Sequence, residues 1–248
     1  MPKESFAGPG DRPPALTVVI PVFNEEDNIV PLAREVLHAL EPTGVSFEIL
    51  FVDDASRDGT PNALRQAGAL DARVRWVRHA ANAGQSAALW TGLRASSSLW
   101  VATLDGDGQN DPADLPVMMK RLEPVDMVCG HRVTRQDSWL RRCSSRIAFG
   151  ARAWILGSSF RDTGCALRVF RRSCVESLFP FNGIHRFLPI LVARSGGRVE
   201  EVPVGHRPRA FGVSKYGVWN RLWRGLFDLA GVAWYLKRRL PEQPLDPG

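Results

Sequence analysis

The sequence lacks any uninterrupted apolar run close to the roughly 18 residues that a helix needs to cross a bilayer. Its first 15 residues contain Asp11 and four prolines, and they lack the apolar core of a signal peptide. We therefore expect a chain that stays in the cytoplasm, either free or attached peripherally to the inner face of the cell membrane.

Short motifs of several common protein classes are also missing. No GxGxxG follows the first predicted strand and no GxxxxGK[ST] occurs, which argues against a dinucleotide oxidoreductase and a P-loop NTPase. No helix-turn-helix, zinc-finger or RNP-like signature appears, so a nucleic-acid partner is not expected. The four cysteines form no CxxC pair, and we expect reduced, mostly structural thiols.

Charge is distributed unevenly along an otherwise ordinary globular composition, with 44% hydrophobic and 23% charged residues in 248. Residues 1–129 carry 11 Lys and Arg against 18 Asp and Glu, whereas residues 130–248 carry 21 against 8. A basic half indicates an anionic partner such as a phosphorylated substrate or an anionic membrane, with a merely solvated basic face as the alternative.

Strand-like and helix-like segments alternate through the first half. Strands are expected at Leu16–Val22, Phe47–Val52, Val74–Val77, Leu99–Leu104 and Met127–Cys129, and helices at Asp27–Leu40, Thr60–Leu70, Gln85–Ala95 and Pro112–Leu122. This alternation predicts an α/β domain with a mostly parallel sheet. Ligands bind such sheets beyond the carboxyl ends of the strands.

Polar side chains follow each of the first four predicted strands. They are Asn24 and Glu25, Asp53 and Asp54, Asn82, and the run Asp105-Gly106-Asp107-Gly108-Gln109. Any one cluster is ordinary turn chemistry, but four that converge on one edge indicate a site. Carboxylates two residues apart, with Gln109 two further on, suit a Mg²⁺ or Mn²⁺ ion that also binds a diphosphate.

Seven blocks of the sequence resemble family 2 glycosyltransferases, in the order that this family has them. The blocks are VVIPVFNEEDNI, ILFVDDASRDGT, NAGQSAALWTGL, VATLDGDGQNDP, GHR, DTGCALRVFRR and RAFGVSKYG, and together they span about residues 16–218. The nearest resemblance is to the dolichol-phosphate mannose synthase branch and its bacterial polyprenyl-phosphate relatives.

The resemblance implies a GT-A, Rossmann-like domain that inverts the sugar configuration during transfer. The implied donor is a nucleotide sugar, with GDP-mannose favoured and a UDP-sugar as the second choice. The implied acceptor is dolichyl or undecaprenyl phosphate. A polysaccharide or other non-lipid acceptor is the alternative.

The same resemblance implies roles for individual residues. Donor-binding residues would be Pro21, Phe23, Glu25, Val52, Asp54, Asp105 and Gly106. Metal ligands would be Asp105, Asp107 and Gln109. Catalytic residues would be Asp107, Arg132, Arg209 and Lys215, with the three basic side chains binding phosphates.

No carboxylate stands out as a general base apart from Asp162, which could equally cap a turn or orient the acceptor. A phosphate monoester acceptor needs no base, because its second pKa is roughly 6 and it is mostly dianionic at neutral pH. The scarcity of base candidates therefore favours a lipid-phosphate acceptor.

The predicted organisation is a flexible segment 1–14, a catalytic domain 15–217, a helix 218–240 and a flexible tail 241–248. The helix combines tryptophans with the terminal basic run Lys237-Arg238-Arg239, which is typical of a helix that lies on a membrane surface. Packing against the domain core is the alternative for this helix. Ser138–Leu156 is a second candidate for membrane contact.

Overall fold

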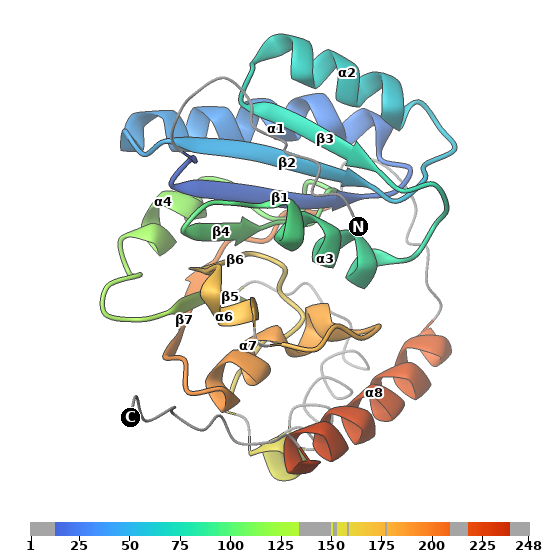
Figure 1. Cartoon of the computed structure of the whole chain (residues 1–248), viewed down its shortest axis with the longest axis vertical. Helices are drawn as coiled ribbons and strands as arrows, with labels where there is room; N and C mark the ends of the chain where they lie inside the picture. Colours follow the sequence, from blue (N-terminus) through green and yellow to red (C-terminus); the bar gives the residue numbers. More distant parts are fainter. Residues whose placement is uncertain are drawn as a thin grey trace, which may run out of the picture.

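A computed structural model describes residues 13–133, 150, 153–157, 159–176, 178–208 and 218–238. A seven-stranded sheet runs through its centre in the order β3-β2-β1-β4-β6-β5-β7 (Figure 1). The strands are β1 (Leu16–Val22), β2 (Phe47–Asp53), β3 (Val74–Arg78), β4 (Trp100–Thr103), β5 (Met127–Arg132), β6 (Arg168–Arg171) and β7 (Val199–Val204). Strand β6 runs antiparallel to both β4 and β5, and the other pairings are parallel.

Helices cover both faces of the sheet (Figure 1). They are α1 (Glu26–Leu40), α2 (Thr60–Leu70), α3 (Gln85–Ala95), α4 (Asp114–Met119), α6 (Ser173–Glu176), α7 (Ile184–Arg194) and α8 (Val218–Arg238), with a 3₁₀ turn η1 at Glu41–Thr43. One core cluster joins the sheet to α1, α2 and α4, and the other joins it to α3, α7 and α8.

Strand β1 shows why the central strands are apolar at almost every position. Val18 and Ile20 belong to the core under α1, while Val19 between them belongs to the core under α3. Because successive side chains point to opposite faces, a strand with helices on both sides buries them all.

The predicted first half is confirmed, with small shifts of the boundaries. Strand β1, helix α2 and helix α3 have the expected bounds. The helix expected at Pro112–Leu122 is shorter, at Asp114–Met119, and the strand expected at Met127–Cys129 extends to Arg132. The sequence reasoning assigned nothing to β6, α7 or β7.

The C-terminal helix α8 packs one side against the domain and exposes the other. Leu229 and Val232 are buried in the core cluster that contains α3 and α7, whereas Phe227 and Trp234 are 82% and 67% exposed. Within the part of the chain that the structure describes, no helix is both long enough and apolar enough to cross a membrane.

Three cysteines are described, and all are free thiols. Burial raises the pKa of Cys129 to about 12, and burial also raises the pKa of Cys165. A thiol that stays protonated is a poor nucleophile, so both act as small apolar groups of the core.

Candidate active site

The loops at the carboxyl ends of β1 and β2 are bound to each other. Asn24 accepts a hydrogen bond from the Arg57 amide at 2.8 Å, and its own amide donates to Ser56 Oγ at 2.9 Å. Among the described non-glycine residues, positive φ values occur at Asn24 (52°) and Ala55 (61°), both in these loops. Backbone strain of this kind collects at functional sites, where the surrounding contacts hold it in place.

Asp54 organises the loop that follows β3. Its carboxylate accepts hydrogen bonds from the amides of Ala83 and Gly84 at 2.8 and 2.7 Å, and it lies 2.8 Å from His79 Nδ1. Val52 on the same strand is completely buried beneath α3. Of these two expected donor-binding residues, Asp54 therefore positions a loop and Val52 belongs to the core beneath it.

The other expected donor-binding residues lie at the end of β1. Pro21 lines a pocket. Glu25 is buried, its carboxylate accepts a hydrogen bond from Asn28 Nδ2 at 2.7 Å, and its amide donates to Thr60 Oγ1 at 2.8 Å. Phe23 is partly exposed at the same edge of the sheet. These contacts fix the course of the chain between β1 and α1.

Asp105 and Asp107 follow β4 directly. Asp105 Oδ1 accepts a hydrogen bond from Gln85 Nε2 at 2.8 Å, and Asp107 Oδ1 accepts from the Gln109 amide at 3.2 Å. Gly106 between them is buried, and a Cβ there would come within 2.5 Å of Val22 Cγ1. Glycine therefore lets this run approach the end of β1 closely, and alanine would require Val22 to move.

The donor atoms after β4 fit a hard divalent cation. Two carboxylates and the side-chain oxygen of Gln109 supply only oxygen, and Mg²⁺ usually takes one or two carboxylates together with substrate phosphates. Within the described residues no group of three or more His, Cys, Asp and Glu side chains could hold a metal by itself. A metal at this place would therefore need further ligands, such as those of a bound substrate.

The chain after β7 lies against this run. Gln109 Nε2 donates to the Arg207 carbonyl at 3.3 Å, the Arg207 amide donates to the Gln109 carbonyl at 2.9 Å, and Asn110 forms an isolated bridge with His206. Arg209 and Lys215, predicted to bind phosphates, lie outside the described residues. The described segment that ends just before Arg209 is thus in contact with Gln109, one of the predicted metal ligands.

Arg132 at the end of β5 forms a bidentate ion pair with Asp162. Arg132 Nε and Nη2 donate to the two carboxylate oxygens at 2.7 and 2.9 Å, and the side chains are only 18% and 9% exposed. Burial opposes the charge of Arg132, but the hydrogen bond and charge of Asp162 outweigh it and raise its pKa. A carboxylate held in this way, which also accepts from the Gly164 amide at 3.2 Å, is a poor proton acceptor.

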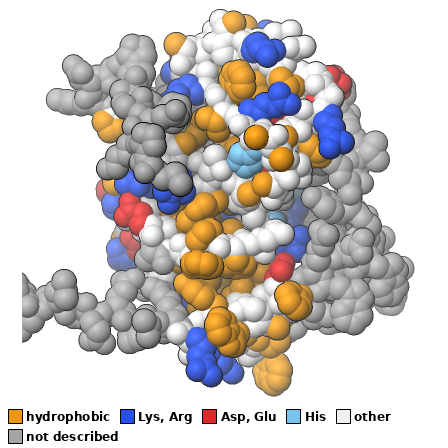
Figure 2. Space-filling model, turned by 45° about the vertical axis from the view of Figure 1, so that its right-hand side comes forward, with side chains coloured by type: hydrophobic (Ala, Val, Ile, Leu, Met, Phe, Trp, Pro, Cys, Tyr) orange, Lys and Arg blue, Asp and Glu red, His pale blue; other side chains and the backbone are white. Residues whose placement is uncertain are grey.

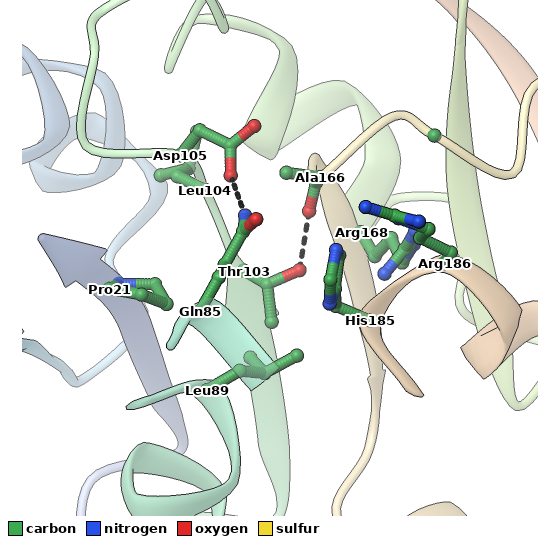
Figure 3. Close-up of a pocket in the computed structure, with 11 residues that line it drawn as sticks. Pro21, Gln85, Leu89, Thr103, Leu104, Asp105, Ala166, Arg168, His185 and Arg186 are labelled. Atoms are coloured by element: carbon green, nitrogen blue, oxygen red, sulfur yellow. Dashed lines mark hydrogen bonds between the residues drawn. The ribbon is translucent and has the colours of Figure 1, made fainter. Parts of the chain in front are cut away.

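A pocket of about 360 Å³ opens beside Asp105. Its walls come from the ends of β1 and β4, the start of α3, the turn before β6 and the start of α7. Figure 3 shows Asp105 and Gln85 on one side of it, and Arg168, His185 and Arg186 on the other. We call these last three residues the basic wall.

The sequence reasoning missed the basic wall. Arg168 stands inside the block DTGCALRVFRR, but no pattern connects it to His185 and Arg186, which lie on a helix that was not assigned. The arginine that precedes the apolar pair Val169-Phe170 was the available signal, because a charged side chain is rarely buried without a partner.

The profile of the family described as Glycosyl transferase family 2 matches residues 17–179, which include β1 to β6 and the Asp105–Gln109 run. The chain belongs to this family. The match includes Asp105 and Arg168 on the two sides of the pocket, whereas His185 and Arg186 lie beyond its end.

Two curated members of the family are closely similar in sequence. The chain is 36% identical over 228 residues to the dodecaprenyl-phosphate galacturonate synthase of Rhizobium johnstonii, covering 90% of this chain and 67% of that one. It is 36% identical over 216 residues to the undecaprenyl-phosphate 4-deoxy-4-formamido-L-arabinose transferase of Edwardsiella ictaluri, covering 86% and 66%. The chain thus spans about two thirds of the length of these relatives.

A solved structure shows the same fold. Glucosyl-3-phosphoglycerate synthase from Mycobacterium tuberculosis, in complex with Mn²⁺, UDP and glucosyl-3-phosphoglycerate, superposes with a TM-score of 0.65 at 18% identity. The alignment covers 93% of this chain and 82% of that chain. The expected GT-A, Rossmann-like architecture of this family 2 glycosyltransferase is therefore confirmed.

Proposed function

We propose that this family 2 glycosyltransferase moves a sugar from a nucleotide-sugar donor to a polyprenyl phosphate, with inversion at the anomeric carbon. Asp105, Asp107 and Gln109 would hold a divalent metal, Mg²⁺ or Mn²⁺, against the donor diphosphate. The metal would act as a Lewis acid that stabilises the departing nucleoside diphosphate. Both similar relatives carry polyprenyl-phosphate acceptors in their names, which supports this acceptor class.

The observation that carries the proposal is the chemistry of the pocket. Asp105 is the only carboxylate among the described residues that line it, and Asp162, the one candidate base in the sequence, is held by Arg132. A hydroxyl acceptor would need a free base at this place, whereas a phosphate acceptor is already anionic at neutral pH. The pocket therefore suits a phosphate better than an alcohol.

The sugar is proposed only as a class. Resemblance favoured mannose, but the names of the two similar relatives mention galacturonate and a formamido-arabinose. We take the donor to be a nucleotide-linked pyranosyl sugar.

The proposed place of action is a membrane surface. Trp154 (87% exposed), Phe227 and Trp234 are exposed, and a groove lined by Ile155, Leu236 and Lys237 places the segment 153–157 next to α8. Figure 2 shows hydrophobic side chains gathered in a band on one face, with Lys or Arg side chains at its lower end. Tryptophans beside basic residues suit the boundary between lipid and water.

One assay tests the proposed reaction. The purified chain is incubated with a panel of UDP- and GDP-sugars, with Mn²⁺ or Mg²⁺, and with one of three acceptors: a polyprenyl phosphate, the matching polyprenol, or a soluble oligosaccharide. We expect transfer to the phosphate alone. Efficient transfer to the oligosaccharide or the polyprenol would replace this proposal with the non-lipid or alcohol acceptor class.

A further inference from the structure

The basic wall of the pocket has a buried arginine whose charge the described residues do not neutralise. Arg168 is 2% exposed, and its Nη2 donates to the Thr163 carbonyl at 2.9 Å. In the part of the chain that the structure describes, no carboxylate forms an ion pair with it. A buried charge is costly unless an opposite charge and hydrogen bonds compensate it. The pocket that Arg168 lines is open to such a compensating anion.

His185 presents a neutral hydrogen-bond donor beside Arg168. Ser86 Oγ accepts from the Gly183 amide at 2.8 Å and lies 2.7 Å from His185 Nδ1. The arrangement that satisfies all these atoms has the hydroxyl donating to Nδ1, which leaves the proton of the ring on Nε2. Burial, followed by the charges of Arg186 and Arg168, lowers the pKa of His185 to about 3, so the ring is uncharged at neutral pH.

Arg186 completes the wall on the side of α8. Its Nη1 lies 3.5 Å from Asp228 Oδ2, at the long end of ion-pair distances, and its side chain is 38% exposed. A guanidinium has five N–H donors, so a long contact of this kind leaves Arg186 able to bind a second anion. Asp228 is on the same helix as the exposed Phe227 and Trp234.

We propose that the basic wall binds the phosphate of the acceptor, with Arg186 as the principal contact and with Arg168 and the Nε2–H of His185 completing the set. This inference rests on the proposed function and assigns residues to its acceptor. The wall faces Asp105 across the pocket, so a sugar between them would have its leaving diphosphate on the acidic side and the incoming phosphate on the basic side.

The transfer step is balanced without a base. An oxygen of the dianionic acceptor phosphate forms a bond to the anomeric carbon, while the bond from that carbon to the diphosphate oxygen breaks. The bonding electron pair leaves with the nucleoside diphosphate. The acceptor loses one negative charge as it becomes a diester and the leaving group gains one, so no proton moves. The basic wall would orient the attacking oxygen, and the dianionic phosphate has no proton to give up.

The test compares Arg186→Gln and Arg186→Lys with a matched control, Arg65→Gln, which changes an exposed arginine on α2 on the opposite face of the sheet. Geranyl phosphate serves as a water-soluble acceptor, so that membrane binding does not enter the measurement. For Arg186→Gln we expect the KM for geranyl phosphate to rise tenfold or more and the KM for the donor to stay within twofold. Lysine should recover part of the loss, and the control should match the wild type.

A second measurement detects the site without turnover. Geranyl phosphate alone should raise the melting temperature of the wild type and of Arg65→Gln, but not that of Arg186→Gln. His185→Gln, which keeps an N–H donor, should bind it more tightly than His185→Phe.

The outcomes separate this inference from the proposed function. If the wild type transfers sugar to geranyl phosphate and Arg186→Gln does so with the same KM, the acceptor site lies elsewhere and only this inference fails. If Arg186→Gln instead raises the KM for the donor, the basic wall binds an acidic group of the donor sugar, and the inference is again wrong. If the wild type transfers to no prenyl phosphate at all, the proposed function itself is overturned.

Discussion

Replacing Asp162 with asparagine distinguishes a structural carboxylate from a catalytic base. The side chain keeps its size but loses its charge, and one of its two oxygens becomes an NH₂ group that faces the Arg132 guanidinium. Both hydrogen bonds, at 2.7 and 2.9 Å, are affected, in a place where the two side chains are 9% and 18% exposed.

The expected loss of stability is large for a single substitution. Hydrogen bonds to charged groups contribute about 1.5–3 kcal/mol each, and removing one partner of a fully buried ion pair costs about 3–5 kcal/mol. Since this pair retains some contact with solvent, we expect about 2–4 kcal/mol for Asp162→Asn. In a chain of this size that corresponds to a decrease of roughly 5–15 °C in melting temperature.

Unfolding in urea measures the loss, and a double-mutant cycle with Arg132→Gln assigns it to the pair. The double variant should be more stable than the sum of the single changes predicts, because each single change leaves the partner without compensation. Additive changes would refute the reasoning about the pair. A base role predicts the opposite pattern: unchanged stability together with a loss of turnover of a thousandfold or more.

Four further predictions concern the metal, the phosphates, the membrane and pH. Asp107→Asn should abolish both transfer and the rise in melting temperature that Mn²⁺ with a nucleoside diphosphate produces, and full activity in EDTA would contradict the metal assignment. Arg209→Lys should lose much of the activity, because a guanidinium that can bind phosphate through two N–H groups is replaced by a point charge. Normal turnover by both Arg209→Ala and Lys215→Ala would exclude a phosphate-binding role for Arg209 and Lys215. The fraction of protein that pellets with anionic liposomes should decrease as the salt concentration rises and decrease again when residues 218–240 are deleted, since each basic residue near such a surface contributes about 1 kcal/mol. Pelleting that changes with neither salt nor the deletion would contradict membrane contact. The pKa of His185 is lowered from 6.5 to about 3, so between these pH values the unfolded chain binds a proton that the folded chain does not. The free energy of unfolding should therefore be greatest above pH 6.5 and fall towards pH 3. In a series of urea titrations, His185→Gln should remove part of this pH dependence.

The first half of the fold was predictable because local signals and tertiary packing agree there. Strands buried on both faces give continuous apolar runs, and the helices between them have clear apolar sides. Strand β6 gives no such signal, since it reads Arg-Val-Phe-Arg. The structure explains how it tolerates arginine: Arg171 stacks over the Trp100 ring at 4.5 Å and Arg168 turns into the pocket.

The candidate site was predictable on one side only. The Asp105–Gln109 run is contiguous, so its chemistry can be recognised without knowledge of the fold. The basic wall depends on contacts between distant parts of the chain, such as Ser86 with His185, which are 99 positions apart. Its three residues can be recognised as one site only when the positions of α3, β6 and α7 in the fold are known.

The antiparallel strand β6 marks the place where strands from the two halves of the chain meet in the sheet. Strands β3, β2, β1 and β4 come from the acidic first half of the chain, whereas β6, β7 and the end of β5 come from the basic second half. The boundary between β4 and β6 runs beneath the pocket, with Asp105 on one side and Arg168 on the other. A donor that arrives as a metal complex has part of its charge neutralised and can approach Asp105, while a bare phosphate is repelled from Asp105 and attracted to the basic wall. Two anionic substrates would therefore be sorted by the field before either makes contact, and binding of the acceptor should weaken with ionic strength more steeply than binding of the metal-bound donor.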